Sequence, residues 1–388
     1  MGILNNTVSI CQFQIISTTQ KKDLVSWVGD GLSKNRFRSI EHTSEELSIG
    51  WVQLNDYQDS EFNGAHTYHH EHYFSFSLRI DQRKLPQALL KPYILKAEEQ
   101  WLAKNPQFNR VPKKQREDLR DAVRGSLFAK SLPSPAIYDA VWDTRSNLVS
   151  FCSLSNKLID QFVELFNKSF EGLRLVPLHP MARAAQVVDE TLKPTLQAAN
   201  ASSSGSILEQ IEANQWLGED FLLWLMHETM NSASEYSITQ DGPGVSGESF
   251  VAYLDDRLVL VANNETGLQK VSVTGPQNNF NEVRAALQDG KDILEAVLFL
   301  EKQEDLWKMN LKGNSFHFAS YKAPPVTLEK DDIVDASMER EALFFERMFL
   351  VEQGLQLFDS LLAAFLKQRL DAGWSAKVQA IRNYLAAA

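Results

Sequence analysis

Alternating polar and apolar residues predict β-strands in the first half of the chain. In residues 69–80 small or polar side chains alternate with Phe74, Phe76 and Leu78, so this segment predicts one strand with a single buried side. Further strands are expected at 7–17, 47–54, 136–143, 147–153 and 173–178. Apolar spacings of three and four predict helices at 21–32, 86–104, 112–130 and 156–170. Strands and helices mixed in this way predict an N-terminal α+β domain, placed at residues 1–185.

The second half of the chain predicts another α+β domain and a helical end. The domain is placed at 207–325, after the polar stretch 198–206, which is the expected linker. Its expected elements are helix 218–229, strands 250–254, 257–262 and 268–273, helix 282–287, strand 293–301 and the hairpin strands 306–311 and 315–320. A C-terminal helical segment at 330–388 begins with one long helix, or two in line, over 333–370. We interpret that apolar helix as core or as a dimer contact.

Composition places the chain among cytoplasmic globular proteins. It has 388 residues, of which 44% are hydrophobic, enough for two or three domains. We expect no membrane-spanning helix, because no uninterrupted apolar run has the necessary length, and no signal peptide at the start. Cys11 and Cys152 lie in apolar, strand-like runs, so we expect both to be buried free thiols.

Positive charge is concentrated between residues 79 and 132. This stretch holds thirteen Lys or Arg and six Asp or Glu, in a chain whose formal charge is −11. Such segregation favours a polyanionic partner. Within 112–130 the cations recur every three or four residues and form one helical stripe: Lys113, Arg116, Arg120 and Arg124. Another face of the helix is expected to pack on the protein body: Leu119, Ala122, Val123, Ser126 and Leu127. The stripe favours contact with nucleic-acid phosphates; the alternative is an ordinary solvated face.

Candidate catalytic residues are sparse. Four histidines lie close together, at 66, 69, 70 and 72, and His70 and His72 are expected to share a strand face, a spacing that can hold zinc. The alternative is an exposed polar strand end. The carboxylate pairs Asp255-Asp256 and Asp331-Asp332 are expected in a turn and at a helix start. We therefore expect no catalytic residue, metal or cofactor, and keep a metal-dependent DNA exonuclease as an alternative. A second alternative is a protein-interaction module acting through the C-terminal helix.

Several short motifs recur in an order and spacing typical of one family. They are Gly50-Trp51-Val52, Lys84-Leu85-Pro86, Leu119-Arg120-Asp121-Ala122-Val123 with Ser126-Leu127, Trp142-Asp143-Thr144 and Leu175-Val176-Pro177-Leu178. Over residues 7–180 the chain resembles the bacterial recombination-associated RdgC family. The resemblance implies a nucleoid-associated protein that binds double-stranded DNA without sequence preference. It also implies a ring-shaped homodimer that encircles the duplex and limits access of RecA, a candidate partner. The family's older exonuclease label implies no nuclease centre.

The charge pattern and the resemblance together define the expected site. The expected DNA-binding residues are Arg79, Arg83, Lys84, Lys113, Arg116, Arg120, Arg124 and Lys130. The expected dimer contact consists of Leu127, Phe128 and Leu132, and Leu132 stands where the family has an aromatic contact. A basic fingertip that closes the ring in the family corresponds to residues 270–277, where Lys270 is the basic residue.

Overall fold

Two compact units, each built from separate stretches of chain, make up the protein. The computed structural model describes residues 2–17, 23–43, 45–203, 206–264, 267–327 and 336–387. The larger unit contains Met1–Ile16, Arg145–Asp160 and Arg174–Ala388, and the smaller unit contains Ser17–Thr144 and Gln161–Leu173. These limits differ from the domains expected from the sequence, because the first strand pairs near the other end of the chain, with Thr7 opposite Lys322. The predicted α+β class is confirmed.

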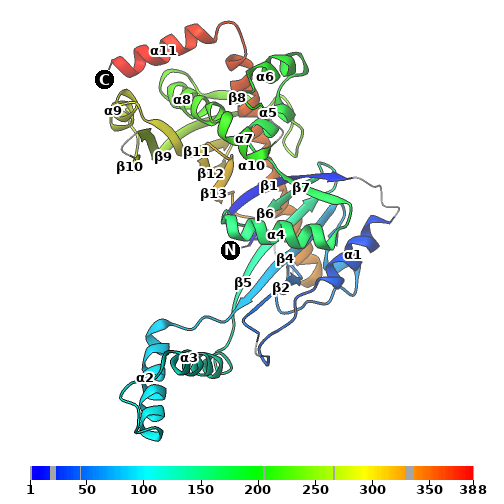
Figure 1. Ribbon diagram of the computed structural model, residues 1–388. Helices are drawn as coiled ribbons and strands as arrows, with labels where there is room; N and C mark the ends of the chain where they lie inside the picture. The colour runs from blue at the N-terminus through cyan, green and yellow to red at the C-terminus, as the bar shows by residue number, and fades with distance from the viewer. Residues whose placement is uncertain are drawn as a thin grey trace. The chain divides into compact units, whose positions relative to one another are not determined.

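The smaller unit is an antiparallel sheet with helices. Its elements are α1 (Leu24–Lys34), β2 (Leu47–Val52), the short 3₁₀ helix η1 (Ala65–Thr67), β3 (His69–His70), β4 (Tyr73–Gln82), α2 (Gln87–Lys104), α3 (Lys113–Phe128), β5 (Ser134–Asp143) and most of α4 (Asn156–Ser169). The strand order is β5-β4-β2, with β3 paired to β4. Figure 1 shows α2 and α3 as a helical hairpin between β4 and β5.

An aromatic cluster forms the core of the smaller unit. Trp51 of β2 meets the ring of Phe76 edge-on at 5.0 Å and that of Phe162 at 5.9 Å. The Trp51 indole also donates a 2.7 Å hydrogen bond to Ser169 at the end of α4. These contacts fix α4 on the sheet, since edge-to-face aromatic pairs add stability beyond the area they bury.

The strand predicted over residues 69–80 is interrupted. Glu71 adopts the left-handed conformation, with φ of 53°, and reverses the chain between β3 and β4. The prediction of a single buried side is also wrong, because Ser75 and Ser77 are as inaccessible as the Phe residues beside them. The hydroxyl of Ser77 is satisfied by Asp139 on the adjacent strand β5.

The larger unit contains the other strands and most of the helices. Its elements are β1 (Thr7–Ser17), β6 (Leu148–Phe151), β7 (Leu173–Pro177), α5 (Pro180–Val187), η2 (Glu190–Leu192), α6 (Lys193–Ala199), α7 (Ile207–Ala213), α8 (Trp216–Asn231), β8 (Glu235–Ser237), β9 (Ser249–Asn264), β10 (Gly267–Val273), α9 (Asn281–Gln288), β11 (Asp292–Lys302), β12 (Asp305–Lys312), β13 (His317–Lys322), α10 (Ala336–Arg369) and α11 (Trp374–Ala386). The order is β10-β9-β11-β12-β13-β1-β6, with β8 on β9 and β7 on β1.

Helix α10 is the centre of this unit's core. It crosses β12 and β13, where the Trp307 indole donates to the carbonyl of Leu350 and the Tyr321 hydroxyl to that of Val351. By length and composition alone α10 would suffice to cross a membrane, but 72% of its most apolar stretch is buried inside the protein. The interpretation of this helix as core is confirmed. It is one helix from Ala336 onward, and the expected helix start at 333–335 lies outside the described residues.

Three further expectations change in the larger unit. Residues 250–262 form part of one continuous strand, so Asp255-Asp256 is not a turn between two strands. Asp256 has a left-handed φ of 67°, and the pairing of this strand with β11 shifts register at that point. The expected linker 198–206 begins inside α6, and Asn214 holds it through hydrogen bonds to Asn200 and Ala201. Its residues 204–205 lie outside the described residues.

Both cysteines are buried and free, as predicted. Cys11 on β1 donates its thiol to the carbonyl of Ser153 at 3.2 Å. Burial raises the pKa of this thiol far above its usual range, although a hydrogen bond to the backbone opposes that shift.

The close approach of α10 to the sheet depends on Gly354. A Cβ at this position would lie 2.1 Å from the Tyr321 hydroxyl and 2.4 Å from the Trp307 ring. We expect Gly354→Ala to destabilise the larger unit by about 1–3 kcal/mol through overpacking. Gly125 in α3 is a matched control because nothing lies within 4 Å of its Cβ position. Gly125→Ala should stabilise its helix by up to about 1 kcal/mol. Denaturant unfolding of both variants checks the pair, and equal midpoints would contradict it.

Candidate nucleic-acid interface

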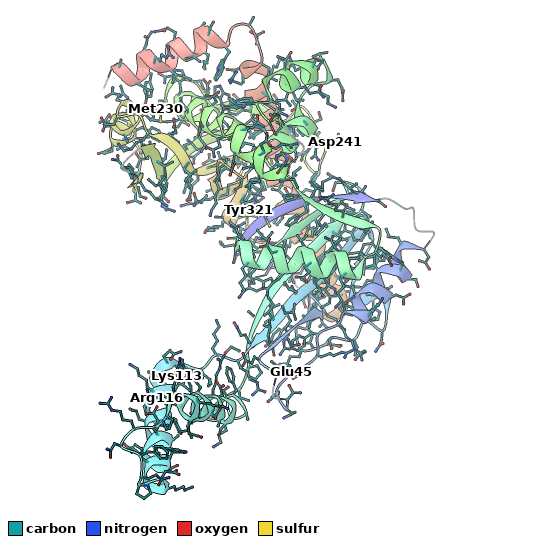
Figure 2. All side chains as sticks on the ribbon, viewed as in Figure 1. Glu45, Lys113, Arg116, Met230, Asp241 and Tyr321 are labelled. Atoms are coloured by element: carbon teal, nitrogen blue, oxygen red, sulfur yellow. The ribbon has the colours of Figure 1, made fainter. Side chains whose placement is uncertain are left out.

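The basic residues project from a two-helix hairpin. Pro86 and Pro112 lie immediately before α2 and α3, where a missing backbone donor costs little and the fixed φ suits a helix start. The two helices pack on one another, and Leu90 is the only fully buried side chain of α2. The hairpin therefore has a thin core and a large solvent-exposed surface. Figure 2 shows Lys113 and Arg116 on it.

The apolar face predicted for α3 is only partly correct. Leu127 is buried and Leu119 and Val123 are half-buried, but Ala122 and Ser126 are exposed. The physical reason is that α3 packs against the single helix α2 rather than against a broad protein surface. A helix with one narrow neighbour leaves most of its circumference in water.

The cationic stripe on α3 is solvent-exposed along its length. Lys113, Arg116, Arg120 and Arg124 are all exposed. Arg116 lies 3.1 Å from Glu98 of α2, and Arg124 lies 3.6 Å from Glu46. Both ion pairs are at the surface, where a pair stabilises by only about 0–1 kcal/mol. The two guanidinium groups can therefore exchange these carboxylates for phosphates at little cost.

Arg79 is held by contacts within the smaller unit. Its guanidinium makes two hydrogen bonds to the carboxylate of Asp81, at 2.8 and 2.9 Å, and lies 4.3 Å above the ring of Phe37. It also donates to the carbonyl of Tyr57. Although predicted at the interface, Arg79 is thus fixed on the sheet by an ion pair and a ring.

Arg83 is a buried clamp at the base of the hairpin. Its side chain is 3% exposed and donates to the carbonyls of Phe128 and Ser131 after α3. The same guanidinium donates to three carbonyls in the segment before β2: those of Ile40, Glu41 and Thr43. These bonds join the end of α3 to the segment before β2. Arg83 therefore positions the hairpin and has no guanidinium donor facing solvent for a phosphate.

The remaining predicted residues fall into exposed and buried groups. Lys84 and Lys130 are exposed beside the hairpin. Of the expected dimer contacts, Leu127 and Phe128 are buried within the chain, whereas Leu132 is 73% exposed. Sequence reasoning missed two exposed residues one helical turn apart on α2, Leu89 and Tyr93. The sequence signal for these two residues is that the apolar side chains between positions 89 and 95 are spread around more of the helix surface than a single packing face requires.

The four histidines do not form the expected zinc-like pair. His70 ends β3 and is buried, whereas His72 lies in the turn after Glu71, so the two do not share a strand face. Asp256 pairs with Lys308 at 2.7 Å, and Asp255 accepts a hydrogen bond from the backbone of Gln277. Asp331-Asp332 lies outside the described residues. Within the described ranges, no three His, Cys, Asp or Glu side chains are grouped so that they could hold a metal.

Comparison with known families identifies this region. The family model described as "Putative exonuclease, RdgC" matches residues 13–203, a range that contains the whole hairpin and the sheet beneath it. The chain therefore contains an RdgC family domain over these residues, which make up just under half of its length. No curated protein matches the chain.

Arg83 and its neighbour Lys84 provide a test of the clamp. Arg83→Ala should destabilise the smaller unit by about 3 kcal/mol or more, since it removes a buried side chain together with all of its hydrogen bonds to the end of α3 and to the segment before β2. Lys84→Ala removes an equal charge from an exposed position and should change stability by no more than about 0.5 kcal/mol. Denaturant unfolding compares the two variants. Limited proteolysis between α3 and β5 should be faster in Arg83→Ala alone, and equal rates in both variants would contradict the clamp.

Proposed function

We propose that the protein binds double-stranded DNA without sequence preference through the α2–α3 hairpin. The observation that carries this proposal is the exposed stripe of Lys113, Arg116, Arg120 and Arg124 on one helix face. Successive cations lie one helical turn apart, about 5–6 Å by helix geometry, a spacing that can follow a phosphate backbone. Phosphate contacts carry no sequence information, which accounts for the expected lack of preference.

The proposed assembly is a homodimer that surrounds the duplex. One cationic helix can contact only one side of the DNA, and a two-fold copy presents the same stripe to the opposite side. Exposed apolar side chains beside the hairpin support a protein contact there, namely Leu132 together with Leu89 and Tyr93 of α2. The RdgC family domain favours this arrangement. A closed clamp on DNA in the nucleoid would limit access of RecA to the strands it covers.

The two alternatives have less support. A protein-interaction module acting through the long C-terminal helix needs an exposed face, but most of α10 is core. A metal-dependent exonuclease is suggested by the description of the family model. Incubation with end-labelled duplex in Mg²⁺ or EDTA distinguishes it from binding, since metal-dependent loss of label indicates a nuclease and a mobility shift with intact ends indicates binding.

Removing the stripe should weaken DNA binding. Changing Arg116, Arg120 and Arg124 together to Ala should lower affinity for all sequences alike and reduce the slope of log affinity against log salt by up to about three, one unit per lost phosphate contact. Fluorescence anisotropy with duplexes of equal length and different sequence, at several salt concentrations, measures both quantities.

The matched control removes the same charge elsewhere in the family-matched region. Lys157, Lys168 and Arg174 are exposed on α4 and β7, and their triple change to Ala should leave the slope unchanged. If both triple variants lose equal affinity, net charge is the determinant and the stripe is not the site. If the folded stripe variant binds normally, the proposed site is wrong.

Leu132 tests the homodimer. Because its side chain is exposed within the chain, Leu132→Asp should fold normally but dissociate, since a carboxylate buried in an interface costs several kcal/mol. Light scattering should show the mass of two chains for the wild type and one for the variant. Leu208, exposed on α7, supplies the control change Leu208→Asp, which should remain dimeric. A wild-type mass of one chain at micromolar concentration would refute the homodimer.

A further inference from the structure

The last described helix, α11, lies on α8 and α9 of the larger unit through a single face. The residues of that face recur every three or four positions: Trp374, Lys377, Val378, Ile381, Tyr384 and Leu385. Ile381 is the only residue of α11 that is fully buried. A helix of this length is marginal by itself in water, so its stability depends on this contact. Release of α11 from α8 and α9 therefore amounts to its local unfolding.

Polar side chains of α9 hold the end of α11. Arg284 is 7% exposed, donates to the carbonyl of Tyr384 and lies 4.4 Å from the centre of that ring. Gln288 donates to the carbonyl of Leu385. At the other end, Trp374 lies 5.2 Å from the guanidinium of Arg369 in α10. Helix α11 is therefore anchored at both ends, and the middle of its packing face contains charged and titratable side chains instead.

Lys377, in the middle of the packing face, meets a carboxylate and an imidazole on α8. Its ammonium pairs with Oε1 of Glu228. Nδ1 of His227 lies 3.4 Å from the same oxygen. The His227 ring meets the Tyr384 ring edge-on at 5.7 Å. Both α8 residues are buried, so α11 confines an ammonium and a titratable imidazole around one carboxylate.

The surroundings of His227 oppose its protonation. Burial lowers the pKa of His227, the charge of Lys377 lowers it further, and Glu228 acts in the opposite direction. The other titratable groups around this contact are Tyr384 of α11, Arg284 of α9 beyond the Tyr384 ring, and Tyr236 of β8, which faces Glu228. The Tyr384 ring that covers one side of His227 and the charge of Lys377 both come from α11 and depend on its remaining in place.

We propose that α11 is an acid-released strap, with His227 as the group that senses the proton. With α11 detached, His227 returns toward the ordinary pKa of about 6.5. The docked form then binds a proton less readily than the detached form, so docking is favoured above pH 6.5 and is weakened as pH falls. For one such group the opening equilibrium increases by at most about tenfold between pH 7.5 and 5.5.

Hydrogen exchange of residues 374–386 in the full chain measures this opening. After correction for the intrinsic pH dependence of exchange, opening in the wild type should increase severalfold, up to about tenfold, from pH 7.5 to 5.5. In His227→Gln, whose amide stays neutral throughout, this increase should disappear. Lys377→Met should reduce the increase, because it removes the charge that α11 places against His227.

The control is His317, a half-buried histidine of the larger unit. Burial, aided by Lys312, lowers the pKa of His317 on β13 to about 4. His317→Gln should leave the pH dependence of α11 as in the wild type, and exchange from β12 reports any global loss of stability. An α11 opening that is independent of pH would overturn the proposal. An equal increase in α11 opening in the wild type and in His227→Gln would also overturn it. If His227→Gln fails to fold, an increase in Lys377→Met as large as in the wild type would overturn it.

Discussion

The contact on which the larger unit depends is the passage of α10 over β12 and β13 at Gly354. Side-chain donors from the sheet reach carbonyls of the helix there, from Trp307 to Leu350 and from Tyr321 to Val351. These bonds need a helix with no side chain at the crossing point. Two turns before Gly354, the buried Arg347 donates to the carbonyls of Ile3 and Asn5. A single helix thus fixes the central strands and the start of the chain.

In the smaller unit, unlike the larger one, a prominent element lies outside the core. Its aromatic cluster is dense around Trp51, but the hairpin that leaves the sheet has almost no core of its own. The guanidinium of Arg83 compensates by tying the end of α3 to the segment before β2. Cationic residues therefore have two separate roles here. Buried Arg83 determines where the hairpin starts, and exposed residues such as Arg120 give it a charged surface.

Local sequence patterns correctly predicted those strands and helices whose formation depends mainly on their own residues. The first strand, 7–17, and the basic helix near 113–128 follow from β-branched alternation and from a proline followed by charged, helix-favouring residues. The role of Arg83 was not predictable, because its acceptors lie forty or more residues away on either side. The break at Glu71 was also missed, since a left-handed residue other than glycine has no strong sequence signal. Among the expected site residues, the sequence could not separate the cations that face solvent from those that support the fold.

The two cysteines give this protein an intrinsic chemical reporter. Cys11 and Cys152 both belong to the larger unit, and each side chain is buried in a folded strand region. The thiolate is the species that reacts with alkylating agents, and burial disfavours the thiolate of Cys11. Alkylation should therefore follow the rate at which this unit opens. The native sequence thus permits pulse labelling of unfolding without an added probe.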